Sequence, residues 1–389
     1  MLSKEENERF TRVGPGTPMG ALLRRYWHPV APVQELTSES PTKILRVLGE
    51  DLVLFKDKSG RVGCLADHCA HRGASLLYGR VEERGIACAY HGWLYDTSGS
   101  CLECPAEPAG SMFHLTVKQT AYPVRRLAGL YWIYMGPDPA PEIPRYDVWV
   151  RRDLQRRIVA GPNLECNWFQ AIENGVDSFH ASILHQDAGG RAPASTTRGV
   201  LDEIDHIDSW PVSFGVQKRY YYTSGWWRQH PWIFPNIVCL HGVTQHNTPI
   251  DDTHVLRFRL YFEPRAENSE GPDSTEEVNP LEYGGPVKEP PHAQHPVARY
   301  DMRKSVEAQD FMAWETQGPI ADRSTERLAT SDRWIVELRD VFRENLRRVE
   351  EGLDPLGVVR DPAHGVIETE LSSSSPERMA ARGAAARGR

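Results

Sequence analysis

The chain has 389 residues, of which 40% are hydrophobic and 9% aromatic, enough for one large or two medium-sized globular domains. Its 45 Lys and Arg against 53 Asp and Glu give a net charge of -8, so no overall basic field exists to bind nucleic acid or an anionic membrane. The N-terminus lacks the basic-then-apolar pattern of a secretory signal, and no apolar run approaches membrane-spanning length. We therefore expect a cytoplasmic protein whose seven cysteines are free thiols or metal ligands.

The first predicted elements are a short helix followed by strands. Residues 18–26 have the apolar and basic pattern of a helix, within an N-terminal segment, residues 1–27, that we expect to pack on a later domain. Short β-prone runs separated by Gly-rich and charged turns then predict a β-meander, and so an all-β domain over residues 28–138. These strands are predicted at residues 44–48, 52–55, 61–65 and 130–135.

The second predicted domain spans residues 139–368 and mixes helices with aromatic-rich strands, which predicts an α+β fold. Within it, residues 265–299 are rich in Pro, Gly, Glu and Ser, so we expect a long surface excursion there. From Ser324 to Val349 apolar residues recur at helical spacing and predict a long helix. The Ser-, Ala- and Arg-rich composition of residues 369–389 predicts a disordered tail. Strands are expected at residues 219–222, 237–243 and 255–262.

Two Cys–His pairs stand out in the all-β domain. Cys69 and His71 form a Cys-x-His pair, and after sixteen further residues Cys88 and His91 form a Cys-x2-His pair. Two thiolates on one iron and two neutral imidazoles on the other are the ligands of a Rieske-type [2Fe-2S] cluster. The imidazoles raise its potential from about -400 mV to roughly -150 to +300 mV, so the cluster can accept electrons from a ferredoxin or a flavin reductase. A Cys2His2 zinc site is the alternative, although zinc fingers usually group like ligands together.

The residues around these pairs carry a family resemblance. The two pairs, followed by Gly-Trp-x-Tyr-Asp ending at Asp96, resemble the Rieske domain of ring-hydroxylating oxygenases. Ala70 stands where this family most often has proline, and we expect alanine to permit the same turn. Cys101 and Cys104 form a Cys-x-x-Cys pair outside any βαβ context, so we interpret them as structural thiols rather than a redox pair.

A second group of candidate ligands lies near the middle of the chain. His180 and His185 are five residues apart, about 140° on a regular helix, so the helix has to end or loosen between them for both to reach one metal. Asp177 lies three residues before His180, which places it on the same helical face. Ferrous iron that activates O2 takes two histidines and one carboxylate on one face, and the third ligand has to come from elsewhere.

The family resemblance implies this third ligand. Residues 309–315 resemble the Asp-bearing helix that completes the triad in Rieske oxygenases, which implies that Asp310 binds the mononuclear Fe(II). Glu307 and Glu315 are the alternatives.

The resemblance also implies a role for Asp177. An acid at this position in the family connects the iron ligand His180 to His71 or His91 of a neighbouring subunit, and so provides an electron path between the two centres. Such head-to-tail packing closes into a ring, most simply a homotrimer or a multiple of one. The alternative is that Asp177 only caps its helix.

Further segments resemble one branch of the family. Residues 2–27 are similar to phthalate-type oxygenases with a single α-subunit, and residues 166–174 and 318–324 to the 5,5'-dehydrodivanillate O-demethylase branch. The implied fold is α+β, with an all-β Rieske domain inserted near the N-terminus of a helix-grip-like catalytic domain. The implied function is O-demethylation of a methoxylated aromatic acid, using O2 and electrons from NAD(P)H that a ferredoxin or flavin reductase delivers. The alternatives are cis-dihydroxylation or ring hydroxylation of an aromatic carboxylate such as a phthalate, and a Rieske electron-transfer protein without oxygenase activity.

An aromatic substrate of this kind would be held by flat apolar side chains, with an arginine on its carboxylate. The candidate aromatic residues are Trp210, Phe214, Tyr220, Tyr221, Trp226 and Trp227, about half of which we expect to be ordinary core residues. The candidate arginines are Arg191, Arg198 and Arg219.

Overall fold

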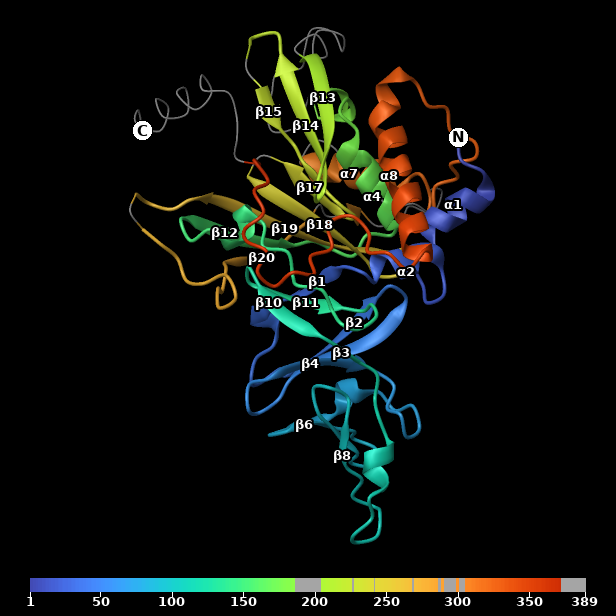
Figure 1. The fold of residues 1–389 in the computed structure, drawn as a ribbon, viewed down its shortest axis with the longest axis vertical. Coiled ribbons are helices and arrows are strands. Elements are labelled where there is room, and N and C mark those ends of the chain that lie inside the picture. The colour runs from blue at the N-terminus through green and yellow to red at the C-terminus, as the bar shows by residue number, and fades with distance from the viewer. Residues whose placement is uncertain are drawn as a thin grey trace.

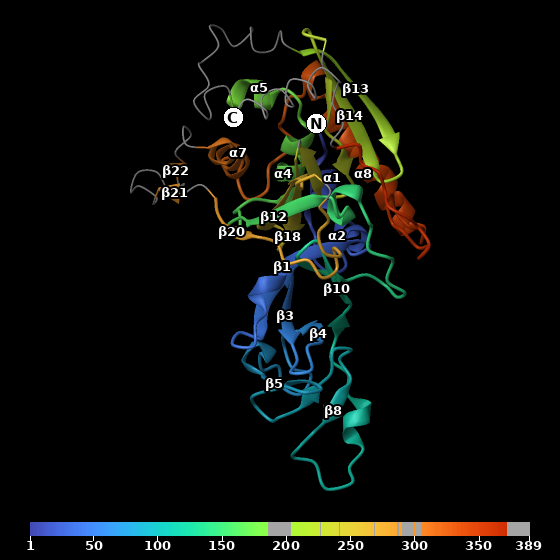
Figure 2. The same cartoon turned by 90° about the vertical axis from the view of Figure 1, so that its left-hand side faces the viewer.

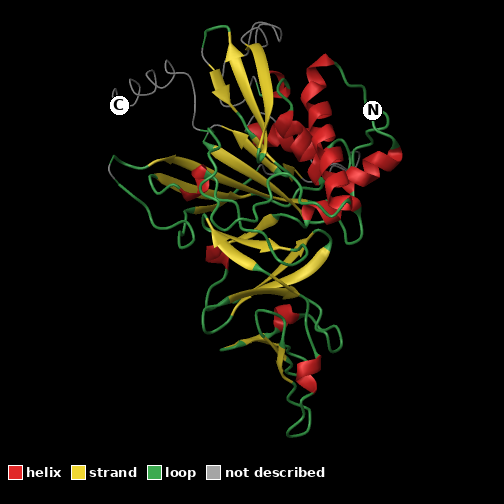
Figure 3. Cartoon of the chain, viewed as in Figure 1, coloured by secondary structure: helices red, strands yellow, loops and turns green. Residues whose placement is uncertain are grey.

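The computed structural model describes residues 1–185, 204–225, 227–240, 242–267, 269–285, 288–289, 299–300 and 305–371. Within this part of the chain, a β-rich region lies at one end and a large sheet covered by helices at the other, as Figures 1 and 3 show. Arg191, Arg198, Trp226 and residues 372–389 of the expected tail lie outside the described residues. No helix of the described part is long and apolar enough to cross a membrane.

The β-rich region starts from a three-stranded sheet in the order β1-β11-β10. Two antiparallel four-stranded sheets follow, β2-β3-β4-β9 and then β5-β6-β7-β8, which forms the tip of the molecule. Strands β2 to β4 and β11 coincide with the four runs predicted from the sequence. The bounds are β1 Trp27–Pro32, β2 Thr42–Val47, β3 Glu50–Lys56, β4 Val62–Ala66, β5 Arg80–Glu82, β6 Gly85–Ala87, β7 Leu94–Tyr95, β8 Cys101–Glu103, β9 Ala121–Tyr122, β10 Val124–Leu127 and β11 Leu130–Tyr134.

A nine-stranded sheet forms the framework of the second region. Its order is β13-β14-β16-β17-β18-β19-β12-β20, with β15 paired to β14, and all pairs except β12–β20 are antiparallel. The bounds are β12 Leu154–Ala160, β13 Ile204–Val212, β14 Gly215–Tyr222, β15 Trp227–Gln229, β16 Trp232–Ile233, β17 Ile237–Leu240, β18 Val243–Pro249, β19 Val255–Pro264 and β20 Leu281–Tyr283. Strands β21 (Lys288–Glu289) and β22 (Arg299–Tyr300) form a separate pair.

Helices α4 (Trp168–Val176), α7 (Val306–Glu315) and α8 (Arg333–Glu350) lie on one face of this sheet, with α3 (Asp147–Val150) packed in the core of the opposite face. The expected α+β architecture is therefore confirmed. The predicted long helix starts nine residues later than Ser324, because two carboxylates hold the preceding segment in turns. Asp322 accepts a hydrogen bond from the Ser324 N–H, and Asp332 accepts one from the Ala329 N–H.

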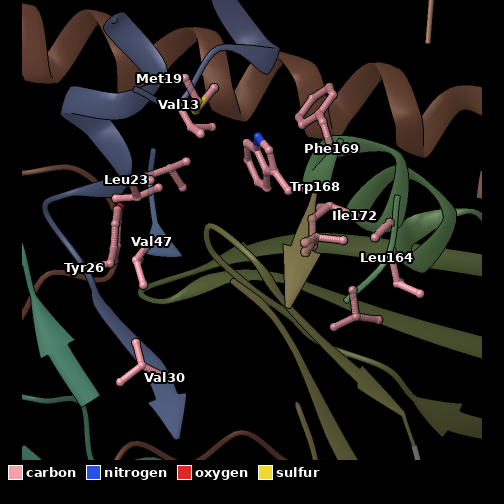
Figure 4. Close-up of a cluster of buried hydrophobic side chains, with 14 of the residues drawn as sticks. Val13, Met19, Leu23, Tyr26, Val30, Val47, Leu164, Trp168, Phe169 and Ile172 are labelled. Atoms are coloured by element: carbon pink, nitrogen blue, oxygen red, sulfur yellow. The ribbon is translucent and has the colours of Figure 1, made fainter. Parts of the chain in front are cut away.

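The N-terminal helices α1 (Lys4–Thr11) and α2 (Pro18–Leu23) pack against the second region rather than against the β-rich tip. Figure 4 shows Val13, Met19 and Leu23 beside Trp168 and Phe169 of α4, in a buried cluster that also includes apolar side chains of α7 and α8. The same cluster contains Val47, Leu52 and Leu54 of the β2-β3-β4-β9 sheet. One hydrophobic core therefore joins the N-terminal helices, the nine-stranded sheet and part of the inserted β-rich region.

Two segments that the sequence predicts to be exposed make buried contacts where the structure describes them. The excursion is anchored, since β20 extends the large sheet and Glu277 forms an ion pair with Arg156 in which both side chains are only 2% exposed. At the start of the expected tail, Thr369 donates a hydrogen bond to Asp147 and Leu371 is buried. Buried hydrogen bonds and apolar contacts of this kind oppose disorder.

Candidate metal centres

The two Cys–His pairs lie on two turns with the same backbone hydrogen bond, near the tip of the β-rich region. The first turn follows β4, and in it the Gly73 N–H donates to the Cys69 carbonyl over 2.8 Å. The second lies between β6 and β7, and there the Gly92 N–H donates to the Cys88 carbonyl over 2.9 Å. Both glycines have φ of +73°, a left-handed conformation that side chains disfavour. The left-handed backbone conformation at the end of each turn thus explains why a glycine stands four residues after each cysteine.

Within each turn the cysteine lies inside and the histidine outside. Cys69 and Cys88 are 3% and 2% exposed, whereas His71 is exposed and His91 half-buried. The two imidazole rings lie 4.6 Å apart between centroids, and His71 stacks on Trp93 at 4.2 Å. The pairs do not form a compact group of three or more ligand atoms around one point, which a single tetrahedral zinc would require. This arrangement fits a cluster with two differently liganded irons.

Two side chains hold the first turn in place. The Tyr95 hydroxyl lies 3.2 Å from the Cys69 sulfur, a contact suited to a thiolate ligand. Buried Gln119 accepts a hydrogen bond from the Ala70 N–H over 2.8 Å and donates to two nearby carbonyls. Proline has no N–H, so alanine permits a contact to Gln119 that proline would remove.

The second centre brings together the three residues expected to bind iron. Ligand atoms of His180, His185 and Asp310 all lie within 4.8 Å of one another. Asp310 Oδ1 is 3.2 Å from His185 Nε2 and 3.7 Å from His180 Nε2, and the two imidazole planes are inclined by 84°. The side chains are 12–20% exposed, so the group is accessible from one side.

The unpaired polar atoms test whether this group fits a metal. Asp310 Oδ1 is shielded from solvent yet makes no hydrogen bond of ordinary geometry, although two imidazole nitrogens lie nearby. Burying such an oxygen without a partner is costly, whereas a divalent cation between the three ligand atoms would satisfy it. Two histidines and one carboxylate also match the facial set preferred by non-haem Fe(II). The residues therefore fit a mononuclear iron.

The helical segments around His180 end both before and after this residue. Helix α4 ends at Val176, with Asp177 as its C-cap, and the short helix α5 runs from His180 to Leu184. His185 follows directly in a non-helical conformation, so the expected end of the helix between the two histidines is confirmed. The expectation that Asp177 shares a helical face with His180 is wrong, because a turn separates them.

This turn nevertheless directs Asp177 to His180. Asp177 Oδ2 lies 3.4 Å from His180 Nδ1, and Oδ1 accepts a hydrogen bond from the Phe179 N–H. Burial acts to raise the pKa of Asp177, but the contacts with His180 and Phe179 outweigh it, so the pKa lies below its ordinary value. The capping role and the contact with His180 thus occur together. The close approach of α4 to the sheet depends on Gly175, where a Cβ would lie 2.3 Å from a Val238 methyl.

Two residues that support this site were not anticipated from the sequence. Gln309 Oε1 lies 2.7 Å from His185 Nδ1, an acceptor that keeps the proton on Nδ1 and turns Nε2 towards Asp310. Lys218 of β14 is buried and donates to the Val176 carbonyl and, over 2.8 Å, to the Ser178 hydroxyl. Gln309 directly precedes Asp310, so its position in the sequence could have suggested a role at the iron site. Nothing in the sequence around Lys218 suggested such a role.

The alternative carboxylates are engaged elsewhere. Glu307 forms an ion pair with Arg259, and Glu315 accepts hydrogen bonds from the Glu165 N–H and the Tyr300 hydroxyl. Of the three acids on α7, Asp310 is the one in the compact ligand group.

Most of the described substrate-pocket candidates face away from this site. Lys218 and Tyr220 of β14 point to the turn after α4, so Arg219, between them, points to the opposite face. There it lies over the rings of Trp210 and Trp227 and donates to Gln229. Arg219 is therefore wrong as a carboxylate ligand near the iron. On that opposite side also lie Phe214, in the second core cluster, and Tyr221, stacked on His206.

A buried arginine occupies the helix-facing side of the sheet instead. Arg257 of β19 lies 4.9 Å from the Trp314 ring of α7 and donates to Gln245. Burial lowers its pKa to about 10, although the Asp310 carboxylate acts in the opposite direction. Its Nε and Nη1 groups have no hydrogen-bond partner among the described residues. The sequence did not indicate this residue.

Comparisons with known proteins agree with both centres. A family model described as the Rieske [2Fe-2S] domain matches residues 26–123, and one described as LigXa C-terminal domain like matches residues 298–371. The 5,5'-dehydrodivanillate O-demethylase oxygenase subunit of Sphingobium sp. (strain NBRC 103272 / SYK-6) is 37% identical over 374 residues, covering 93% of this chain and 85% of that protein. The phthalate 4,5-dioxygenase oxygenase subunit of Pseudomonas putida is 33% identical, with coverage of 92% and 89%.

Solved structures share the fold at lower identity. NdmA of Pseudomonas putida CBB5 with caffeine has a TM-score of 0.65 at 21% identity, covering 88% of this chain and 98% of that one. Dicamba monooxygenase bound to dicamba has a TM-score of 0.59 at 17% identity, covering 85% and 99%.

The chain belongs to the Rieske non-haem iron oxygenases. It is an oxygenase component that carries one Rieske [2Fe-2S] cluster and one mononuclear iron.

Proposed function

We propose that this chain is the terminal oxygenase of a system that O-demethylates a methoxylated aromatic acid. The observation that carries the proposal is the compact group of His180, His185 and Asp310. The chain that holds this group is 37% identical to a demethylase oxygenase subunit. In this reaction an aryl methyl ether, O2, two electrons and two protons give a phenol, formaldehyde and water. One C–H bond of the methyl group is hydroxylated, and the resulting hemiacetal collapses with cleavage of its C–O bond.

The mononuclear iron supplies O2 activation when it is bound, since a facial triad leaves positions open for O2. The chain's own residues hold the geometry. Gln309 fixes the ring of His185, and Asp177 Oδ2 lies 3.4 Å from Nδ1 of His180, so each imidazole would present Nε2 to the metal. The low exposure of the three ligands restricts solvent access to the reacting region.

Electron transfer between the centres requires a neighbouring subunit in this proposal. The turn with Cys69 and His71 lies between β4 and β5, and the turn with Cys88 and His91 lies between β6 and β7. Figure 2 shows β4 and β5 at the opposite end of the molecule from α5 and α7. Asp177 would then connect His180 to His71 or His91 of a neighbour. We propose a head-to-tail homotrimer, or a multiple of one, as the simplest closed ring with this contact.

The surface around the cluster supports such a contact. Large apolar side chains are exposed in the part of the β-rich region that carries the two turns, which is typical of an interaction surface, and one of them, Tyr90, packs on His91. Their exposed fractions are 75% for Tyr78, 57% for Tyr90, 63% for Met112, 43% for Phe113 and 67% for Leu115. A ferredoxin or flavin reductase that takes electrons from NAD(P)H is the proposed donor. A solved relative, the oxygenase of carbazole 1,9a-dioxygenase, is itself described in complex with a ferredoxin.

Product analysis tests the reaction. Holoenzyme with a reducing system is given methoxylated and unsubstituted aromatic acids, and formaldehyde and cis-diols are measured. Formaldehyde formed in step with the demethylated phenol supports the proposal. The 33% identity to a phthalate dioxygenase subunit favours dihydroxylation as the second candidate, and a cis-diol without formaldehyde would establish it instead.

Two measurements test the metal content and the assembly. The proposal requires about three irons and two acid-labile sulfides per chain. About two irons with an intact cluster would instead favour a Rieske electron-transfer protein. Light scattering of the holoenzyme should give three chains or a multiple of three, and a monomer would contradict the proposed electron path.

A further inference from the structure

The Cys-x-x-Cys pair beside the cluster is not used by the proposed reaction. Cys101 Sγ lies 3.6 Å from Cys104 Sγ. Both thiols are free in the structure. Cys101 is 3% exposed and belongs to the core cluster that also contains Cys69, Cys88 and Trp93, whereas Cys104 is half-buried. One thiol is therefore fixed in the tip and its partner is accessible to a small reagent.

The sequence alone favoured structural thiols, but the 3.6 Å separation leads to another interpretation. We propose that Cys101 and Cys104 are a redox modification site, a dithiol that closes reversibly to a disulfide beside the [2Fe-2S] cluster. The site goes beyond the proposed reaction and does not depend on the substrate. A disulfide bond is about 2.05 Å long, so the sulfurs have to approach by about 1.5 Å. Because Cys101 is held in the core, the half-buried Cys104 makes most of this movement. In reducing compartments, such short-range pairs are usually transient and redox-sensing rather than structural.

The oxidant is a low-molecular-weight disulfide such as glutathione disulfide. The Cys104 thiolate attacks one sulfur of this reagent, forms a mixed disulfide and releases one small thiol. Cys101 then loses its proton, and its thiolate attacks Cys104 Sγ and closes the protein disulfide; the second small molecule leaves as a thiolate and takes up a proton. Two electrons and two protons thus pass from the cysteine pair to the reagent.

The position of the pair couples it to the second ligand turn. Pro105 follows Cys104 directly, and its ring lies against Gly92, where a Cβ would be only 3.1 Å from Pro105 Cγ. Gly92 closes the turn that carries Cys88 and His91. Movement of Cys104 towards Cys101 therefore shifts the residue that packs on this turn. We expect the disulfide to change the reduction potential of the cluster, which is sensitive to its surroundings.

Peptide mapping of the holoenzyme tests the modification. The cluster-loaded protein is incubated without O2 in glutathione and glutathione disulfide, alkylated in denaturant and cleaved after glutamate. Glu103 lies between the two cysteines, and the Glu107–Pro108 bond resists cleavage, so the protease separates the cysteines into peptides 84–103 and 104–142 unless a disulfide joins them. The expected result is a joined pair of peptides, with Cys88 alkylated, that dithiothreitol separates. A Cys104 that carries only one glutathione, or a pair that joins only after the cluster absorbance is lost, would overturn the proposal.

Matched variants separate the site from other thiols. Cys104→Ser should abolish the joined peptides and keep the cluster absorbance, while Cys239→Ala, at a buried cysteine of β17, should leave them unchanged. The cluster potential is measured on both forms by redox titration. It should shift on oxidation in the wild type and in Cys239→Ala but not in Cys104→Ser. An unchanged potential in the joined form would overturn the coupling to Gly92.

Discussion

The side-chain oxygen of Gln309 lies 2.7 Å from Nδ1 of His185, and the next residue of the same helix, Asp310, approaches Nε2 of the same ring at 3.2 Å. Two successive side chains of α7 thus contact the two nitrogens of one imidazole. The first fixes the tautomer, and the second would share the proposed iron with this ring. Burial acts to lower the pKa of His185, but these two contacts outweigh it and the pKa is raised.

Replacing Gln309 should therefore weaken iron binding without affecting the cluster. In Gln309→Leu we expect iron affinity to fall by about 10–100-fold, because His185 loses the acceptor that orients it. Iron titration of apo protein with an intact cluster measures this change. Gln309→Glu, which keeps an acceptor, should retain most of the affinity, and Gln317→Leu, at an exposed glutamine, should retain all of it. Equal loss in both leucine variants would contradict the assignment.

Removal of the carboxylate should be more severe. Asp310→Ala leaves two imidazoles, so we expect the iron content to fall from about three to about two atoms per chain, with product formation lost. Metal analysis with the visible spectrum of the cluster measures both centres in one sample. The exposed Asp322→Ala should keep about three irons. Full iron content in Asp310→Ala would exclude this residue as a ligand.

Lys218 should affect both stability and turnover. Its ammonium group is buried and holds the Val176 carbonyl and the Ser178 hydroxyl on either side of Asp177. In Lys218→Met we expect a loss of about 1–3 kcal/mol in the free energy of unfolding, because these acceptors lose a charged donor. Urea unfolding measures the loss. Lys43→Met, which breaks a more exposed ion pair with Glu35, should cost less than about 1 kcal/mol.

The effect of Lys218→Met on Asp177 has its own readout. Lys218 contributes to the lowered pKa of Asp177, so its removal should shift the acid limb of the turnover profile to higher pH. Turnover against pH, at temperatures where wild type and variant are both folded, measures this shift. A variant with lower activity but an unshifted acid limb would show that Lys218 acts only on stability.

Two buried histidines should make the protein less stable in mild acid. Burial lowers the pKa of His28 to about 4 and that of His246 to about 3, against about 6.5 in an unfolded chain. Between these values the unfolded state binds more protons, so stability is complete above about pH 6.5 and is lost as the pH falls towards 4. Each histidine contributes up to about 1.4 kcal/mol per pH unit in this window.

A variant isolates the contribution of one histidine. His246→Gln should show a shallower fall of the unfolding free energy between pH 6.5 and 4 than the wild type, measured by urea unfolding. His364→Gln, at an exposed histidine, should follow the wild type. Comparison at each pH removes the effect of the metal ligands, which all three proteins share. Parallel curves for His246→Gln and wild type would contradict a neutral, buried His246.

The sequence predicted those parts of the two centres that are encoded locally. The four cluster ligands lie in two short turns, and His180 and His185 lie within six residues. Each of these groups could therefore be recognised from the spacing of its residues in the sequence. Asp310 came only from resemblance, since it is more than 120 residues from His185. Lys218 could not be found from the sequence, because its contact with Val176 depends on how β14 packs under α4.

The substrate pocket was predicted poorly for a different physical reason. Aromatic residues were chosen by type, yet adjacent strand residues such as Tyr220 and Tyr221 point to opposite faces. Which face carries the iron is decided by the helices packed on it, and this information is not local. The start of α8 was missed because apolar spacing continues through residues that Asp322 and Asp332 hold in turns.

The shared hydrophobic core has a thermodynamic consequence. Val47, Leu52 and Leu54 of the inserted region lie in the same buried cluster as Trp168 and its neighbours in the catalytic region. Separating the two regions would expose apolar surface on both, which opposes independent unfolding. The two regions are thus one cooperative unit, and calorimetry of the holoenzyme should give a single transition in which the cluster colour and the catalytic domain are lost together.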